Sequence, residues 1–166
     1  VERLQGAARA ARRLAQAFGH RHTLDRHEIF SIEAKNLALA SVAELRALQF
    51  TTRKAEYMMT LANAVVNGTL QLDTLRHVSD TDVIATLTRQ RGLGRWTAEW
   101  FLARALGRPR VVAGDLGVRK AIAAAYLQGR LPSETEVREI TAHWGEAAGV
   151  AQQLLLHALS TGGLQA

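Results

Sequence analysis

Two glycines and one aspartate are the residues of this chain whose types and spacing suggest a chemical function. Gly92 and Gly94 stand between two segments whose apolar residues recur at near-helical spacing, and Asp115 follows downstream. Because glycine adopts positive φ at no steric cost, the pair predicts a sharp reversal between two helices. A hairpin that opens into a helix directs amide N–H groups outward at the positive end of the helix dipole, which suits a phosphate. An ionised Asp115 could stabilise a developing positive charge or deprotonate a water molecule.

The excess positive charge of the chain lies in the same stretch. Residues 89–120 hold eight lysines and arginines against two acids, Glu99 and Asp115, and so carry the whole net charge of +6. The eight cations are Arg89, Arg91, Arg95, Arg104, Arg108, Arg110, Arg119 and Lys120. Since the rest of the chain is balanced, a polyanionic partner is expected to bind near the hairpin.

Helix, glycine hairpin, helix and a loop that ends in an aspartate follow one another from Leu87 to Lys120. This order resembles the helix-hairpin-helix and Gly/Pro–Asp signature of the DNA base-excision glycosylase superfamily. Within it, residues 93–109 (LGRWTAEWFLARALGRP) and 114–121 (GDLGVRKA) resemble the 3-methyladenine DNA glycosylase II family. Looser similarity extends from about Ala7 to Leu159.

The resemblance implies that Asp115 is catalytic. A glycosylase breaks a C1′–N bond through a transition state with cationic sugar character, which a nearby carboxylate stabilises. Asp115 also stands where a helix N-cap would, and both roles can hold at once. In bifunctional glycosylases a Schiff-base lysine occupies the position of Trp96, so that nucleophile is missing here. Trp96 and Trp100 are expected to line the base pocket, where a ring face attracts a cationic alkylated base; the alternative for Trp96 is plain core packing.

The resemblance also implies how the hairpin binds DNA. Backbone N–H groups and cationic side chains are expected to contact phosphates at Gly92, Gly94, Arg95, Trp96, Thr97, Arg91 and Arg119. The backbone carbonyls of Thr88, Gln90 and Leu93 are expected to hold a structural Na⁺ or K⁺, because carbonyl oxygens suit hard cations. No other cofactor is expected, and the absence of cysteine excludes an iron–sulfur cluster and disulfides.

The leading hypothesis is a monofunctional DNA glycosylase that excises alkylated bases, of the 3-methyladenine and 7-methylguanine type, by base flipping in base excision repair. One alternative is a non-catalytic helix-hairpin-helix module that only binds phosphates, which would need neither Asp115 nor Trp96. Another is a glycosylase/lyase for oxidised bases, although Lys120 is the only lysine in the region. The expected partner is double-stranded DNA, bound by a monomer. No apolar run reaches the roughly 18–20 residues of a membrane span, and we expect a cytoplasmic, nucleoid-associated or other intracellular location.

Periodicity and capping residues predict an all-α fold. We expect one helical core over residues 1–166, a glycosylase-like bundle of about eight to ten helices in two clusters with a cleft, without strands and without an N-terminal β lobe. The helix-hairpin-helix would span about 80–107 and the Asp loop about 108–116. Helices are predicted from Val1 to Phe18, after caps at Ser41, Thr51 or Thr52, Ser79 and Ser133, from Leu116 to Leu127, and from Val150 to Ser160.

Two regions fit this picture less well. Residues 20–36 are predicted to be a connection with short helical pieces, and its histidines, His20, His22 and His27, to be surface residues rather than metal ligands. Near the C-terminus, Ala147 and Ala148 stand where the resembled family has an aromatic, basic turn that lines the pocket. In that family a further lobe precedes the first helix, and the residue that wedges into the duplex would lie near Val1.

Overall fold

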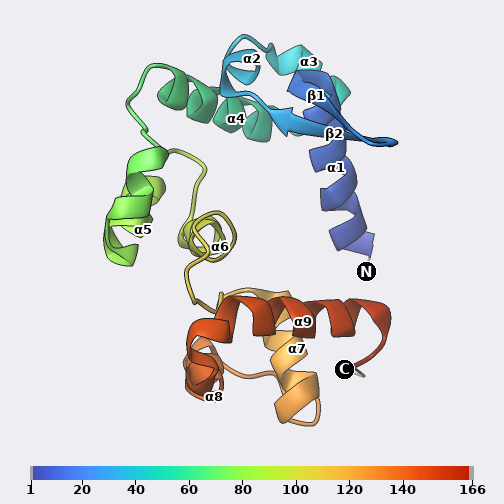
Figure 1. The fold of residues 1–166 in the computed structure, drawn as a ribbon, viewed down its shortest axis with the longest axis vertical. Helices are drawn as coiled ribbons and strands as arrows, with labels where there is room; N and C mark the ends of the chain where they lie inside the picture. Colours follow the sequence, from blue (N-terminus) through green and yellow to red (C-terminus); the bar gives the residue numbers. More distant parts are fainter. Residues whose placement is uncertain (1, 165–166) are drawn as a thin grey trace. The chain divides into compact units, whose positions relative to one another are not determined.

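The computed structural model describes residues 2–164, which divide into two compact units. The first unit comprises the residues up to His77 together with Gln90–Gly92, and the second comprises Val78–Arg89 and the residues from Leu93 onward. Apart from one β-hairpin, the regular structure of the described residues is helical (Figure 1), which confirms the predicted all-α class. No helix in this part of the chain is long and apolar enough to cross a membrane. Val1, near which the wedging residue was expected, lies outside the described residues.

The first unit is built on the long helices α1 and α4. Its elements are α1 (Glu2–Phe18), β1 (Gly19–Leu24), β2 (His27–Ile32), α2 (Ala34–Ala38), α3 (Val42–Ala47), α4 (Thr52–Val66) and the 3₁₀ helix η1 (Asp73–His77). Leu45 and Ala55 are fully buried at its centre, and Phe18, Met58 and Met59 pack against them. The methionine pair therefore belongs to the edge of this core.

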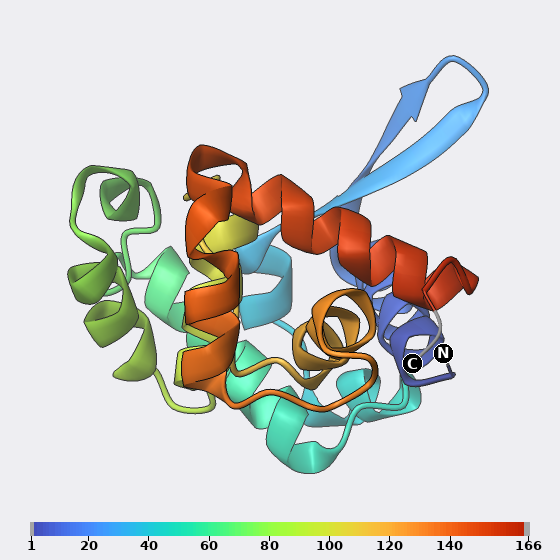
Figure 2. The same ribbon diagram turned by 90° about the horizontal axis from the view of Figure 1, so that it is seen from below.

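The β-hairpin at residues 19–32 shows that the prediction of an irregular, partly helical connection without strands was wrong. β1 and β2 pair antiparallel from Gly19–Ile32 to Leu24–His27, and Figure 2 shows their turn extending beyond α1. Asp25 makes the reversal with φ of +53°, a conformation that aspartate tolerates better than most residues. Most side chains of the β-hairpin are exposed, so its strands have no buried face. Their sequences therefore lack the alternation of apolar and polar residues by which strands are recognised. Among the described residues, no three or more metal-ligating side chains are grouped so that they could hold a metal ion. This includes the β-hairpin histidines, His20, His22 and His27.

The second unit holds the predicted hairpin helices and the Asp loop. Its elements are α5 (Asp80–Thr88), α6 (Arg95–Arg104), α7 (Leu116–Tyr126), α8 (Glu134–Thr141), the 3₁₀ helix η2 (Ala142–Ala147) and α9 (Ala148–Thr161). Ala113, Val118, Ile122 and Val137 are buried at its core, which places the loop before Asp115 against α7 and α8. α6 ends at Arg104, before the predicted end of the helix-hairpin-helix at about 107, and α9 begins at Ala148 rather than Val150.

Helix caps are the local features that the sequence predicts best. Ser41 and Ser133 each form a capping box, in which the serine hydroxyl accepts from the third helical N–H and a glutamate accepts from the serine N–H. Thr51 and Ser79 cap α4 and α5 with their side-chain oxygens, as predicted. These bonds fix where the helices begin, including the first helix of the glycine hairpin.

Candidate active site around Asp115

The two glycines between α5 and α6 have different structural roles. Gly92 has φ of +91°, and a Cβ at this position would overlap the ring of Tyr57, so only glycine fits. Gly94 is extended, with φ of −98°, so only Gly92 of the pair uses the positive φ from which the sharp reversal was predicted. Gly94 is the N-cap of α6 without a side-chain cap, and a Cβ there would meet nothing within 4 Å. The first-turn N–H groups of α6, which include those of Trp96 and Thr97, are therefore left without a capping side chain.

Asp115 receives hydrogen bonds at both carboxylate oxygens. Oδ1 accepts from the backbone N–H of Val118 at 3.0 Å and caps α7. Oδ2 accepts from the indole Nε1 of Trp96 at 2.8 Å and from that of Trp100 at 3.3 Å. The cap and the site are thus one arrangement, because the oxygen that the helix does not use is the one that both tryptophans of α6 hold.

The two tryptophans differ in what their rings contact. Trp96 is 53% exposed, so much of its ring is open to a partner. Trp100 packs against the core of the second unit, and the Arg104 guanidinium lies 4.2 Å from its ring centroid. Plain core packing is therefore wrong for Trp96, whereas Trp100 is partly core and serves Asp115 through its N–H. The pocket for a base remains a prediction, because neither the two tryptophans nor Asp115 line two hollows of the second unit, of about 320 and 490 Å³.

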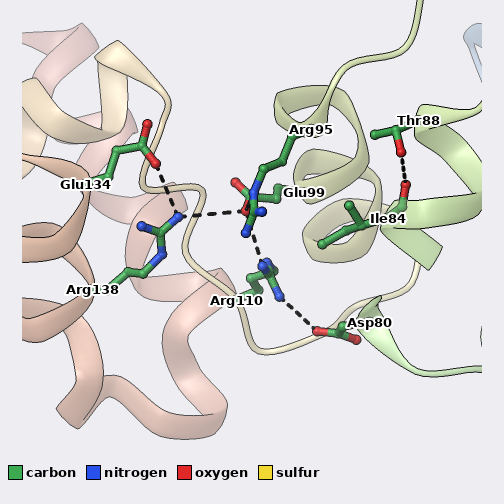
Figure 3. A network of polar contacts seen from close by, with 8 residues as sticks. All are labelled: Asp80, Ile84, Thr88, Arg95, Glu99, Arg110, Glu134 and Arg138. Atoms are coloured by element: carbon green, nitrogen blue, oxygen red, sulfur yellow. Dashed lines mark hydrogen bonds and ion pairs between the residues drawn. The ribbon is translucent and has the colours of Figure 1, made fainter. Parts of the chain in front are cut away.

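A buried glutamate, which in the sequence counted only as one of two acids in a basic stretch, ties the hairpin helix α6 to the Asp loop. Glu99 is only 3% exposed, and its Oε1 lies 3.1 Å from Arg95 Nε and 3.2 Å from Arg110 Nη2 (Figure 3). Arg138 of α8 lies 3.9 Å away, and Arg110 also pairs with Asp80 at 3.2 Å. Removing one partner of a buried ion pair typically costs about 3–5 kcal/mol, so this network holds α5, α6, α8 and the loop together.

A second buried polar side chain, also missed, holds the Asp loop against α9. Gln152 is 1% exposed; its Oε1 accepts from the Val112 N–H at 2.9 Å and its Nε2 donates to the Arg110 carbonyl at 3.2 Å. Satisfying both backbone groups fixes the loop residues that lead to Asp115. The sequence signal was weak, because Gln152 and Gln153 stand side by side in α9 and nothing in the sequence distinguishes the one that is buried.

The predicted DNA-binding arginines have intramolecular partners. Arg95 pairs with Glu99 although its side chain is 66% exposed, and Arg119 Nε donates to the Pro132 carbonyl at 2.8 Å. Arg91 lies over the ring of Tyr57, with 5.6 Å between its guanidinium carbon and the centroid. Phosphate contact by these residues, and by Thr97, stays a prediction.

Comparison with known proteins identifies the family to which the chain belongs. The profile of the HhH-GPD superfamily of base excision DNA repair proteins matches residues 3–147. The chain is 35% identical over 98 residues to DNA-3-methyladenine glycosylase 2 of Escherichia coli, a match that covers 59% of this chain and 34% of the relative. It is 28% identical over 113 residues to a DNA-3-methyladenine glycosylase of Bacillus subtilis, covering 68% and 37% of the two chains.

A solved structure agrees with this assignment. The 3-methyladenine DNA-glycosylase from Archaeoglobus fulgidus superposes with a TM-score of 0.80 at 29% identity, over 92% of this chain and 52% of that one. The chain thus spans between about a third and a half of the length of these three relatives.

Proposed function

Because the chain belongs to the HhH-GPD superfamily of base excision DNA repair proteins, we propose that it is a monofunctional DNA glycosylase that releases alkylated bases from double-stranded DNA. The observation that carries the proposal is the carboxylate of Asp115, held by the N–H groups of Trp96 and Trp100 at Oδ2 and by α7 at Oδ1. A module that only binds phosphates needs no such carboxylate. The similarity to 3-methyladenine DNA glycosylases supports the choice of alkylated bases.

The proposed reaction is hydrolysis of the N-glycosidic bond. The C1′–N bond breaks, the cationic alkylated base leaves as the neutral base, and a water oxygen bonds to C1′. The fixed negative charge of Asp115 stabilises the cationic sugar and orients the water, whose proton passes to the carboxylate or to solvent. Because an N-alkylated base is already a good leaving group, this chemistry needs no strong general acid.

Trp96 supports a monofunctional reaction. An indole cannot form the Schiff base by which a lyase cleaves the strand, and Lys120, on α7, is exposed. The open part of the Trp96 ring can meet a flipped base, and cation–π attraction to an alkylated purine contributes about 0.5–2 kcal/mol. The missing lysine and the exposed aromatic ring thus favour the same substrate class.

The hairpin supplies the DNA contact in this proposal. The uncapped first turn of α6 would accept one phosphate, and an extended Gly94 leaves space for it. A Na⁺ or K⁺ on the carbonyls of Thr88, Gln90 and Leu93 belongs to the same proposal. Thr88 is the last residue of α5, where helix carbonyls lack intrahelical partners, so this carbonyl fits a hard cation.

Base release from methylated duplex DNA tests the proposal directly. The 166-residue chain, mixed in excess with the DNA, should release free 3-methyladenine and 7-methylguanine in a single turnover. Borohydride should trap no covalent adduct on abasic DNA. Tight DNA binding without base release would favour the non-catalytic module, and a strong trapped band would favour a lyase.

A further inference from the structure

Tyr57 of α4 contacts two guanidinium groups, those of Arg53 and Arg91. Arg53 Nε donates to its hydroxyl at 2.8 Å, and the Arg53 guanidinium carbon lies 5.8 Å from the ring centroid. The Arg91 guanidinium lies 5.6 Å from the same centroid. The hydrogen bond from Arg53, and after it the charges of the two arginines, lower the pKa of Tyr57. One aromatic side chain therefore positions a cation from α4 and a cation from the hairpin.

Gly92 is the point at which the glycine hairpin between α5 and α6 packs on Tyr57. A Cβ on Gly92 would overlap the Tyr57 ring, so the hairpin backbone packs directly on the aromatic side chain. Arg91 precedes this contact in the chain, and its backbone is thereby held beside Tyr57. All four residues belong to the first unit, so the cluster is formed within one compact body.

The charges of this cluster are not balanced by acids. Arg95, Arg108, Arg110 and Arg138 all pair with carboxylates, whereas within residues 2–164 Arg53 and Arg91 form no ion pair. The first turn of α4 carries Arg53 and Lys54 without an acidic residue, although cations there are disfavoured by the helix dipole. Two exposed guanidinium groups around one ring repel each other, and an anion bound between them would offset that repulsion.

We propose that Arg53 and Arg91, positioned by Tyr57, form a phosphate-binding site that takes a DNA phosphodiester, additional to the phosphate at the α6 N-terminus. That the phosphate belongs to DNA rests on the proposed function. Guanidinium groups offer planar pairs of N–H donors that match phosphate oxygens, and Tyr57 keeps both groups in place before the ligand arrives. Tyr57 is then a positioning residue, and the two arginines make the contact.

The salt dependence of DNA binding tests the site. For an undamaged duplex, the slope of log Kd against log salt measures the number of phosphates that the protein neutralises. The double variant Arg53→Gln/Arg91→Gln should lose about one unit of this slope, the change expected for one phosphate. Tyr57→Leu, which removes the ring, should lose a similar amount with both arginines present, whereas Tyr57→Phe should lose less.

Arg21→Gln is the matched control, because Arg21 is an exposed arginine of the same unit that already pairs with Glu28 at 2.9 Å. It should keep the parental slope, and the thermal unfolding of every variant should show that it is folded. A double variant whose slope equals that of the parent or falls no further than that of Arg21→Gln would overturn the proposal. If the parent itself releases no base, the glycosylase proposal fails while the slopes still decide on the phosphate site.

Discussion

The substitution Asp115→Asn distinguishes the helix-capping role of Asp115 from its proposed catalytic role. The structure allows the loss of folding stability in this variant to be worked out. The carboxylate accepts three hydrogen bonds on two oxygens, but an asparagine has only one oxygen. If that oxygen caps Val118, the amide NH₂ faces two indole N–H donors. If it faces the indoles, the cap is lost, which costs about 1 kcal/mol. The Trp100 donor is partly buried, and leaving such a donor unpaired costs about 1–3 kcal/mol, so the second orientation is preferred.

The expected loss of stability is therefore about 1 kcal/mol, which lowers Tm by roughly 2–4 °C in a chain of this size. A natural domain has about 5–15 kcal/mol of stability, so the variant stays folded in the assay. Removing one electrostatic stabiliser of a transition state costs about 2.7–4 kcal/mol, or two to three orders of magnitude in rate. The stability loss cannot account for a rate loss of that size, and DNA affinity should hold or rise slightly, because one negative charge is removed.

The assay is single-turnover release of 3-methyladenine and 7-methylguanine, run beside a binding titration and a thermal melt. Ser133→Ala is the matched control, since it removes the N-cap bond to the Glu136 N–H in α8 of the same unit. It should lower Tm by a similar amount and leave the rate unchanged. An Asp115→Asn variant that excises as fast as Ser133→Ala would remove Asp115 from the mechanism and leave only its cap.

Four further substitutions test other parts of the structure. Gly94→Ala should cost at most about 1 kcal/mol and yet weaken DNA binding, whereas Gly92→Ala should also lower Tm clearly because its Cβ meets Tyr57; equal melts for the two would contradict this. Gln152→Leu leaves one buried and one partly buried backbone group unpaired, so denaturant unfolding should show a loss of about 2–6 kcal/mol. The Ser133 N–H, and then Arg130, lower the pKa of Glu136 from 4.5 to about 2, so its charged form stabilises the fold above pH 4.5 and is lost as pH falls towards 2. The Tm difference between the parent and Glu136→Gln should therefore be full at pH 6 and vanish near pH 2, and a difference independent of pH would refute that reasoning.

The parts of the fold that the sequence predicted are those set by short-range bonds. A cap needs only a side chain and an N–H three residues later, so Ser41 and Ser133 could be recognised from the chain alone. The β-hairpin could not, because its strands have no buried face and its turn, at Asp25 and Arg26, contains no glycine. Exposure on both faces removes the pattern that distinguishes a strand from a loop.

The residues of the candidate site also fall into those that could be predicted from the sequence and those that could not. Asp115, Trp96 and the glycines were identified from their order in the chain and the resemblance it carries. Glu99 and Gln152 were not, because their importance comes from burial among partners from distant elements, such as Arg110 and Arg138. A glutamate on a basic helix looks like a surface charge until the fold places three arginines around it.

The geometry of Asp115 explains why a cap and a catalytic carboxylate are hard to tell apart in a sequence. The bond from Val118 N–H fixes Oδ1, and a planar carboxylate with one oxygen fixed has its second oxygen directed by the same torsion angles. The two indole donors then hold Oδ2 in that direction, so the carboxylate needs little reorganisation when positive charge develops nearby. Capping is therefore the means by which the helix orients the charge, and the local pattern that suggests a purely structural aspartate is also what a pre-oriented catalytic group requires.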